Sequence, residues 1–125
     1  MGLVAFKELG RVTPVAATAV GSADTLVTND ADYDTIVKRI IIHNIHTVEV
    51  TAYLCVVPDN AAQVATATDD ERFFAIPIDA GGTAILNSDD LSIPINDTND
   101  TVQIYASVTN KLNAVAFGYV FDDQE

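Results

Sequence analysis

Both histidines and the single cysteine of the chain fall within one apolar stretch, residues 35–60. These residues are His43, His46 and Cys55. A thiolate held beside an imidazole is the arrangement of an activated cysteine nucleophile, so these three residues are the first candidates for chemistry. Whether they can meet depends on how the strands that carry them are paired.

The stretch predicts a β-hairpin with strands near residues 36–44 and 48–56. The purest apolar set of the first strand, Ile36, Ile40 and Ile42, lies at even positions, and the core face of the second is formed by Val48, Val50, Ala52, Leu54 and Val56. Directly paired residues of a hairpin share a face, so even positions must pair with even positions. This requires a three-residue loop at 45–47, with Asn44 opposite Val48.

This register separates the candidate residues. His43 lies opposite Glu49 on the outer face, and His46 lies in the loop. Cys55 lies opposite Val37, roughly 20 Å from His43 at about 3.3 Å per residue. Lys38 falls among the inward residues, opposite Leu54 near a rim. The hairpin therefore predicts no thiolate–imidazole site.

Acidic residues offer other candidates. The alternate spacing that opens a calcium loop occurs at Asp30, Asp32 and Asp34. Thr35 stands where such a loop needs glycine, and the bidentate glutamate is missing, so we favour an acidic turn over the alternative, a calcium site. The pairs Asp69–Asp70 and Asp89–Asp90 have no apolar surrounding to raise a pKa. We expect no catalytic residues, no metal and no cofactor, and we expect that the protein is not an enzyme.

Composition and charge limit the partners. The chain has 125 residues, 49% of them hydrophobic, which suits one globular domain. Eighteen acids against six bases give a net charge of −12, so neither nucleic acid nor a membrane surface is an expected partner. A single cysteine excludes an internal disulfide and fits assembly in a reducing cytoplasm. We expect neither a signal peptide nor a membrane helix.

Short runs rich in Val, Ile, Thr, Tyr and Phe predict an all-β fold. Residues 101–109 and 114–121 alternate cleanly, and we expect a hairpin between them through 110–113. Further strands are expected near 72–78, 83–87 and 91–95, with strand edges or ends at Pro77 and Pro94. The pattern predicts an antiparallel β-sandwich or jelly roll of about seven to nine short strands.

Five segments between residues 25 and 121 follow one another in order: TIVKRIIIHN, VEVTAYLCVV, IDAGGTAILN, LSIPINDTNDTVQIYAS and AVAFGYVF. This order resembles the small all-β virion proteins of tailed bacteriophages. The resemblance implies a β-sandwich that decorates a capsid as a cement protein, or that serves in the neck, tail or fibre. It brings no catalytic residues.

The function implied by this resemblance is structural. We expect a capsid decoration protein that binds the major capsid protein and stabilises the shell, on the capsid surface of a virion assembled in the host cytoplasm. The alternative is a neck, tail or fibre module that binds a host receptor or a glycan. The resemblance also implies a homotrimer, and contacts between subunits are favoured by the aromatic residues Phe73, Phe74, Phe117, Tyr119 and Phe121.

Residues 1–20 precede the region of resemblance and are expected to form an N-terminal arm or an accessory strand, with the β-sandwich domain at 21–125. The segment is apolar and holds two of the six basic residues. Two acidic surfaces repel each other, so this segment is best suited to approach a partner. We expect the capsid contact at Leu3, Val4, Phe6, Lys7, Leu9 and Arg11.

Overall fold

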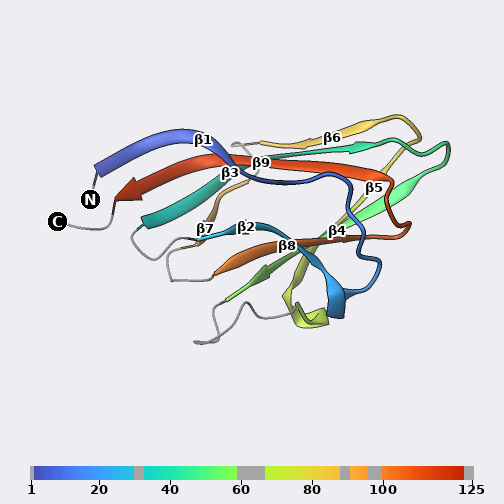
Figure 1. The fold of residues 1–125 in the computed structure, drawn as a ribbon, viewed down its shortest axis with the longest axis horizontal. Coiled ribbons are helices and arrows are strands. Elements are labelled where there is room, and N and C mark those ends of the chain that lie inside the picture. The colour runs from blue at the N-terminus through green and yellow to red at the C-terminus, as the bar shows by residue number, and fades with distance from the viewer. Residues whose placement is uncertain (1, 30–32, 59–66, 88–90, 96–99, 123–125) are drawn as a thin grey trace.

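The computed structural model describes residues 2–29, 33–58, 67–87, 91–95 and 100–122 (Figure 1). Within them the strands are β1 (Gly2–Val12), β2 (Asp24–Thr28), β3 (Tyr33–Asn44), β4 (Val50–Val57), β5 (Arg72–Ile78), β6 (Thr83–Leu86), β7 (Ile93–Ile95), β8 (Thr101–Ala106) and β9 (Leu112–Asp122). Two short 3₁₀ helices, η1 (Val20–Ser22) and η2 (Asp69–Glu71), lie between strands. The fold is an all-β sandwich, as the sequence predicts.

The strands form two antiparallel sheets. Sheet A has the order β1-β9-β3-β6, and β7 also pairs with β3. Sheet B has the order β2-β8-β4-β5. Figure 1 shows β1 and β9 together in one layer and β2 and β8 in the other. The N-terminal segment therefore contributes a strand to sheet A over residues 2–12, and β9 lies between β1 and β3.

Both hairpins expected from the sequence are wrong. β3 belongs to sheet A and β4 to sheet B, so the ladder pairs His43–Glu49 and Cys55–Val37 do not form. β8 and β9 likewise lie in different sheets. At each of these turns the chain crosses the sandwich. The alternation of apolar residues is the same in a hairpin and in a crossing, because in both cases one face of each strand points to the core. In a crossing, the inward residues of the two strands meet across the core and do not lie side by side in one sheet.

Asn44 ends β3 at one of these crossings. Its side-chain nitrogen donates to the carbonyl oxygens of Val48 and Ile78, both at 2.9 Å, and its side-chain oxygen accepts from the backbone N–H of His46 at 2.8 Å. These bonds fix the path by which the chain leaves sheet A.

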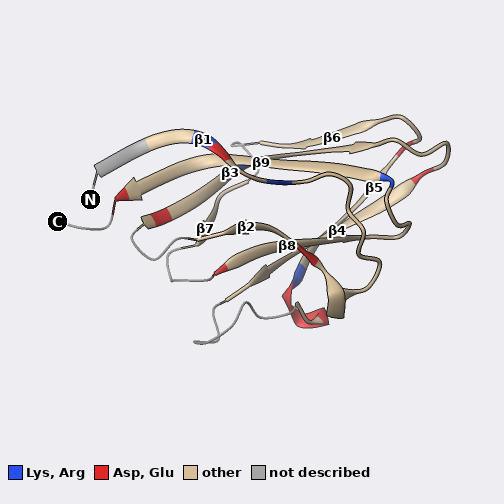
Figure 2. Cartoon of the chain, viewed as in Figure 1, with Lys and Arg blue, Asp and Glu red and all other residues tan. Residues whose placement is uncertain are grey.

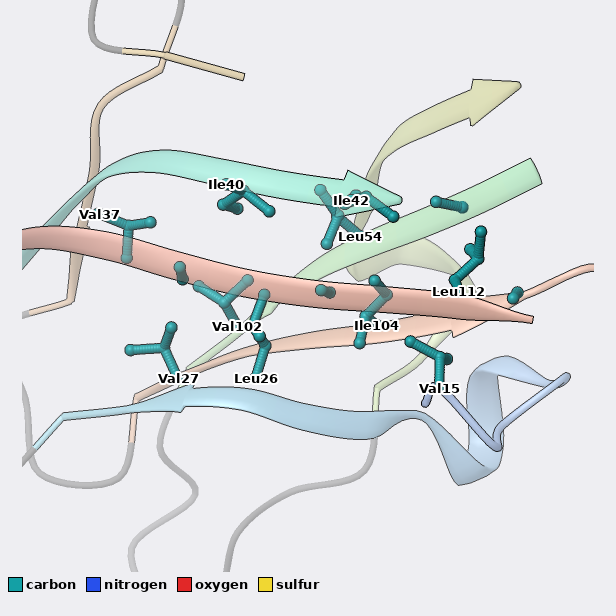
Figure 3. Packing of buried hydrophobic residues seen from close by; sticks show 14 of the residues in the cluster. Val15, Leu26, Val27, Val37, Ile40, Ile42, Leu54, Val102, Ile104 and Leu112 are labelled. Carbon is teal, nitrogen blue, oxygen red and sulfur yellow. The ribbon is translucent and has the colours of Figure 1, made fainter. Parts of the chain in front are cut away.

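The core lies between the two sheets (Figure 3). Its largest fully buried side chains include Ile40, Ile42, Leu54, Ile104 and Leu112, which come from both sheets. Ile40, Ile42 and Leu54 come from the even-numbered faces that the sequence assigns to the core. Val48 is an exception, because it precedes β4 and is 54% exposed.

Irregular pairing in β3 reverses the expected alternation before Arg39, so that Thr35 and Val37 are buried and Ile36 pairs with the exposed Tyr119. A β-bulge between Val37 and Arg39 contains Lys38, which corrects the expected inward position of Lys38 opposite Leu54. Beside the bulge, β9 approaches β3 closely at Gly118, where a Cβ atom would overlap the carbonyl oxygen of Ile36. The inward face of β9 is small here because the two backbones leave no room for a larger side chain.

The outer face of sheet B is covered over β4 and β8 by other parts of the chain. Segments 13–23 and 67–71 pack on it and form a second apolar cluster of Ala17, Cys55, Val57, Ala67 and Tyr105. Tyr105 stacks on Tyr53 at a centroid distance of 4.6 Å and accepts a hydrogen bond of 2.9 Å from Arg72. Gln103 accepts from the backbone N–H of Ala67 at 3.1 Å. This cover explains why every residue of β8 is buried.

Two prolines mark strands with a free side. Pro77 lies in β5 and Pro94 in β7. β5 ends the order of sheet B, and β7 pairs with β3 alone. Both positions agree with the prediction, because proline has no N–H to donate to a ladder.

Candidate binding surface

The structure does not bring His43, His46 and Cys55 together. His43 lies on β3 in sheet A, with its Nδ1 2.8 Å from the Thr83 hydroxyl oxygen of β6. His46 lies in the turn after β3. Cys55 lies in sheet B, in the cluster on its outer face. The sequence predicts the separation correctly but for the wrong reason, since the residues belong to different sheets and not to one hairpin.

Cys55 is also a poor nucleophile. Its side chain is fully buried, and this burial raises the pKa of the thiol, with a further contribution from the negative charge of Glu71. A thiol with a raised pKa stays protonated at neutral pH, and the thiolate is the reactive form.

The acidic candidates do not form a site within the described residues. Asp30 and Asp32 lie outside them, as do Asp89 and Asp90. Asp34 lies in β3 opposite Phe121, and Asp69 and Asp70 lie in η2. Across the described ranges, no group of three or more His, Cys, Asp or Glu side chains could hold a metal ion.

A groove of about 200 Å³ lies between β1 and β2, with Lys7, Leu9, Val27 and Tyr33 among its lining residues.

No helix in the described part of the chain is long and apolar enough to cross a membrane.

The outer face of sheet A, in contrast to that of sheet B, is apolar and open to solvent. β9 places Val115, Phe117, Tyr119 and Phe121 on it, because Ala114, Ala116, Gly118 and Val120 are buried on the opposite side. We call this surface, with the outward residues of the flanking strands, the sheet A face.

The flanking strands extend the sheet A face on both sides of β9. Phe6 of β1 and Ile36 of β3 both pair with Tyr119, and Ile41 of β3 pairs with Val115. Ile85 of β6 pairs with Ile41 in turn. Phe6 is 49% exposed and Ile85 is 57% exposed. The Phe6 ring meets the Tyr119 ring edge-on at a centroid distance of 4.9 Å, so the aromatic residues form one continuous patch.

Charges on the sheet A face are few and of both signs. Glu8 and Arg11 of β1 form a two-pronged ion pair, with Arg11 Nη2 2.7 Å and Arg11 Nε 3.2 Å from the two Glu8 carboxylate oxygens. The hydrogen bond from Arg11 lowers the pKa of Glu8, and the same bond raises the pKa of Arg11. Asp34 and Arg39 of β3 add one charge of each sign. Among the residues that pair with outward residues of β9, two acids therefore stand against two bases, and Lys38 in the bulge of β3 adds a third base beside Arg39, on a chain of net charge −12. Elsewhere Figure 2 shows acidic residues at strand ends and in η2.

The six residues expected to contact the capsid divide between surfaces. Phe6 and Arg11 lie on the sheet A face, whereas Lys7 is exposed at the groove and Leu9 packs against the core. The side chains of Leu3 and Val4 lie outside the described part of the structure, although the backbone of Leu3 pairs with Phe121. Whether any of them contacts a capsid stays a prediction.

Sequence reasoning missed Ile41, Ile85 and Arg39 as members of an exposed surface. Their positions follow from the alternation of β3 and β6 once these strands are known to lie in the sheet whose outer face no described segment covers. The sequence pattern alone does not tell which sheet is covered.

Comparison with protein-family models and with curated proteins found no match to this chain. The fold and the sheet A face therefore define the class: an all-β sandwich with one open apolar face.

Proposed function

We propose that the protein is a non-enzymatic structural protein of a virion, which binds the assembled shell of major capsid protein as a decoration protein and stabilises it. The observation that carries the proposal is the sheet A face, which is apolar, close to neutral and uncovered by the described chain. A monomeric soluble protein rarely keeps such a patch without a partner, so the face suits a component of an assembly. The kind of assembly comes from the resemblance of residues 25–121 to small all-β virion proteins.

We place the shell contact on β1, the strand with the predicted contact residues. Lys7 is exposed and lies outside the sheet A face, beside the groove. A positive charge at this position reduces the repulsion between an acidic protein and an acidic shell. The expected homotrimer rests on the resemblance, whereas the sheet A face supports a two-fold contact, as argued below.

The test is to mix the purified protein with capsid shells that lack it and to measure co-sedimentation, added density on the shell and the melting temperature of the shell. Binding with a raised melting temperature is the expected result. Lys7→Glu should weaken binding without loss of fold. Lys111→Glu, which makes the same charge change in the turn before β9, is the matched control.

Failure of the wild-type protein to bind shells contradicts the decoration role. Binding to host cells or to glycans in place of shells would support the alternative, a neck, tail or fibre module. Equal weakening by Lys7→Glu and Lys111→Glu would move the contact away from β1.

A further inference from the structure

The sheet A face leaves one question open, namely what covers it. Over β4 and β8, the outer face of sheet B is covered by segments 13–23 and 67–71 of the same chain, whereas Phe73 of β5 is 65% exposed. On the sheet A face, Phe6 and Ile85 remain about half exposed and Tyr119 is 36% exposed. The charges on this face identify an occupant.

One row of residues across sheet A has an acid at one end and a base at the other, so it matches a second copy of itself that is turned end for end. Phe117 pairs with Glu8 of β1 on one side and with Arg39 of β3 on the other. Paired residues share a face, so an acid, an aromatic ring and a base stand in line across the strands. With strands about 4.8 Å apart, the acid and the base are separated by about 10 Å and lie on opposite sides of the ring.

We propose that the sheet A face binds a second copy of the chain about a two-fold axis that runs along β9. Turning a copy about this axis lays its β1 over β3 of the first molecule and its β3 over β1. Glu8 of each copy then faces Arg39 of the other, and the two Phe117 rings meet at the axis. The neighbouring row also matches, because the apolar side chain of Phe6 in each copy then faces the apolar side chain of Ile36 in the other.

The charges also disfavour a second face-to-face arrangement. A two-fold axis that runs across the strands at the same row would lay Glu8 over Glu8 and Arg39 over Arg39. Like charges in direct opposition disfavour a complex strongly. Packed β-sheets cross at about 30°, which a small tilt of the axis from β9 provides.

The size of the face sets the strength of the pair. The axis along β9 lays only β1, β9 and β3 of the two copies on one another, so three strands at about 4.8 Å, and about seven residues at about 3.3 Å each, give roughly 330 Å² per copy. The total of about 660 Å² is well below the 1,200 Å² or more of stable complexes, so the pair is weak in solution. Copies held side by side on a larger assembly would pair more readily, because their effective concentration is high.

The experiment is sedimentation equilibrium of the full chain up to about 1 mM, at which even contacts of millimolar affinity are populated. We expect a concentration-dependent dimer. Arg39→Glu sets two acids against each other at both ends of the row and should weaken the dimer at least about tenfold. The double variant Glu8→Arg with Arg39→Glu restores opposite charges between the copies and should bind clearly more tightly than Arg39→Glu, although it also removes the ion pair of Glu8 with Arg11.

Lys111→Glu is the control for the charge change, and circular dichroism with melting checks the fold of each variant. A monomer across the whole range, a trimer, or a double variant as weak as Arg39→Glu would overturn the proposal. Shell binding is measured separately, so failure of the decoration role leaves this result intact and can be distinguished from it.

Discussion

The side-chain nitrogen of Asn44 lies 2.9 Å from the carbonyl oxygen of Ile78, which belongs to the opposite sheet of the sandwich. The same nitrogen reaches the carbonyl oxygen of Val48 at the start of the next segment. Asn44 is fully buried. A single amide therefore satisfies backbone groups on both sides of a sheet crossing.

Asn44→Ala should lower the free energy of unfolding by about 2–4 kcal/mol, because it leaves buried carbonyl oxygens without donors. Urea denaturation measures the change. Asn113→Ala, on the sheet A face beside His43, is the control and should stay within about 0.5 kcal/mol of wild type. Equal effects at the two positions would contradict the structural role of Asn44.

Gly118→Ala should destabilise the protein by about 3 kcal/mol or more, because the new Cβ overlaps the carbonyl oxygen of Ile36 in the neighbouring strand. Gly21→Ala is the matched change, since a Cβ at Gly21 meets nothing within 4 Å. Thermal melting of the two variants should separate them clearly. A Gly118→Ala variant as stable as Gly21→Ala would show that β9 and β3 are less close than described.

The Cys55 thiol should react with iodoacetamide only as fast as the protein unfolds. Burial raises the pKa of this thiol in the folded state. As the pH rises through the ordinary thiol pKa of about 8.5, the unfolded chain loses the proton while the folded protein keeps it. The unfolded state then binds fewer protons, so stability falls with rising pH.

Replacing the thiol removes that effect. Cys55→Ala should show a shallower loss of stability between about pH 8 and pH 10 than wild type. Cys55→Ser should still fold and assemble. Rapid alkylation of the native protein, or identical pH profiles for wild type and Cys55→Ala, would contradict the buried, protonated thiol.

A chelator should leave the melting temperature unchanged. Thr35, which stands where a calcium loop needs glycine, is buried and donates its hydroxyl to the Asn29 side-chain oxygen at 2.7 Å. The position therefore belongs to a strand and not to the tight turn of such a loop. A large fall in melting temperature with chelator, reversed by calcium, would show that the acidic segment before β3 binds metal.

The sequence predicts which residues face inward better than it predicts which strands are neighbours. Ile40, Ile42 and Leu54 are buried as expected. Alternation along a strand reports only that one of its faces is buried. It does not tell whether the next strand of the chain lies beside it in the same sheet or opposite it in the other sheet. The bonds of Asn44 favour the crossing over the hairpin, and no periodicity reveals them.

The candidate surface was only partly predictable for a related reason. Phe117, Tyr119 and Phe121 stand out in the sequence as surplus aromatic residues, and Phe6 and Arg11 as part of a mildly basic segment. That they lie together depends on the pairing of β1 with β9, which joins the two ends of the sequence. Sequence-distant pairing of this kind leaves no local signature.

The central place of β9 in sheet A also governs how the molecule is made. β1 and β3 pair with β9 and not with each other, so sheet A cannot close until residues 112–122 have left the ribosome. Folding dominated by such distant pairings is slow. The Glu8–Phe117–Arg39 row comes into existence only at that last step. Incomplete chains therefore cannot present it, and the order of synthesis itself restricts assembly to molecules that have been translated through β9.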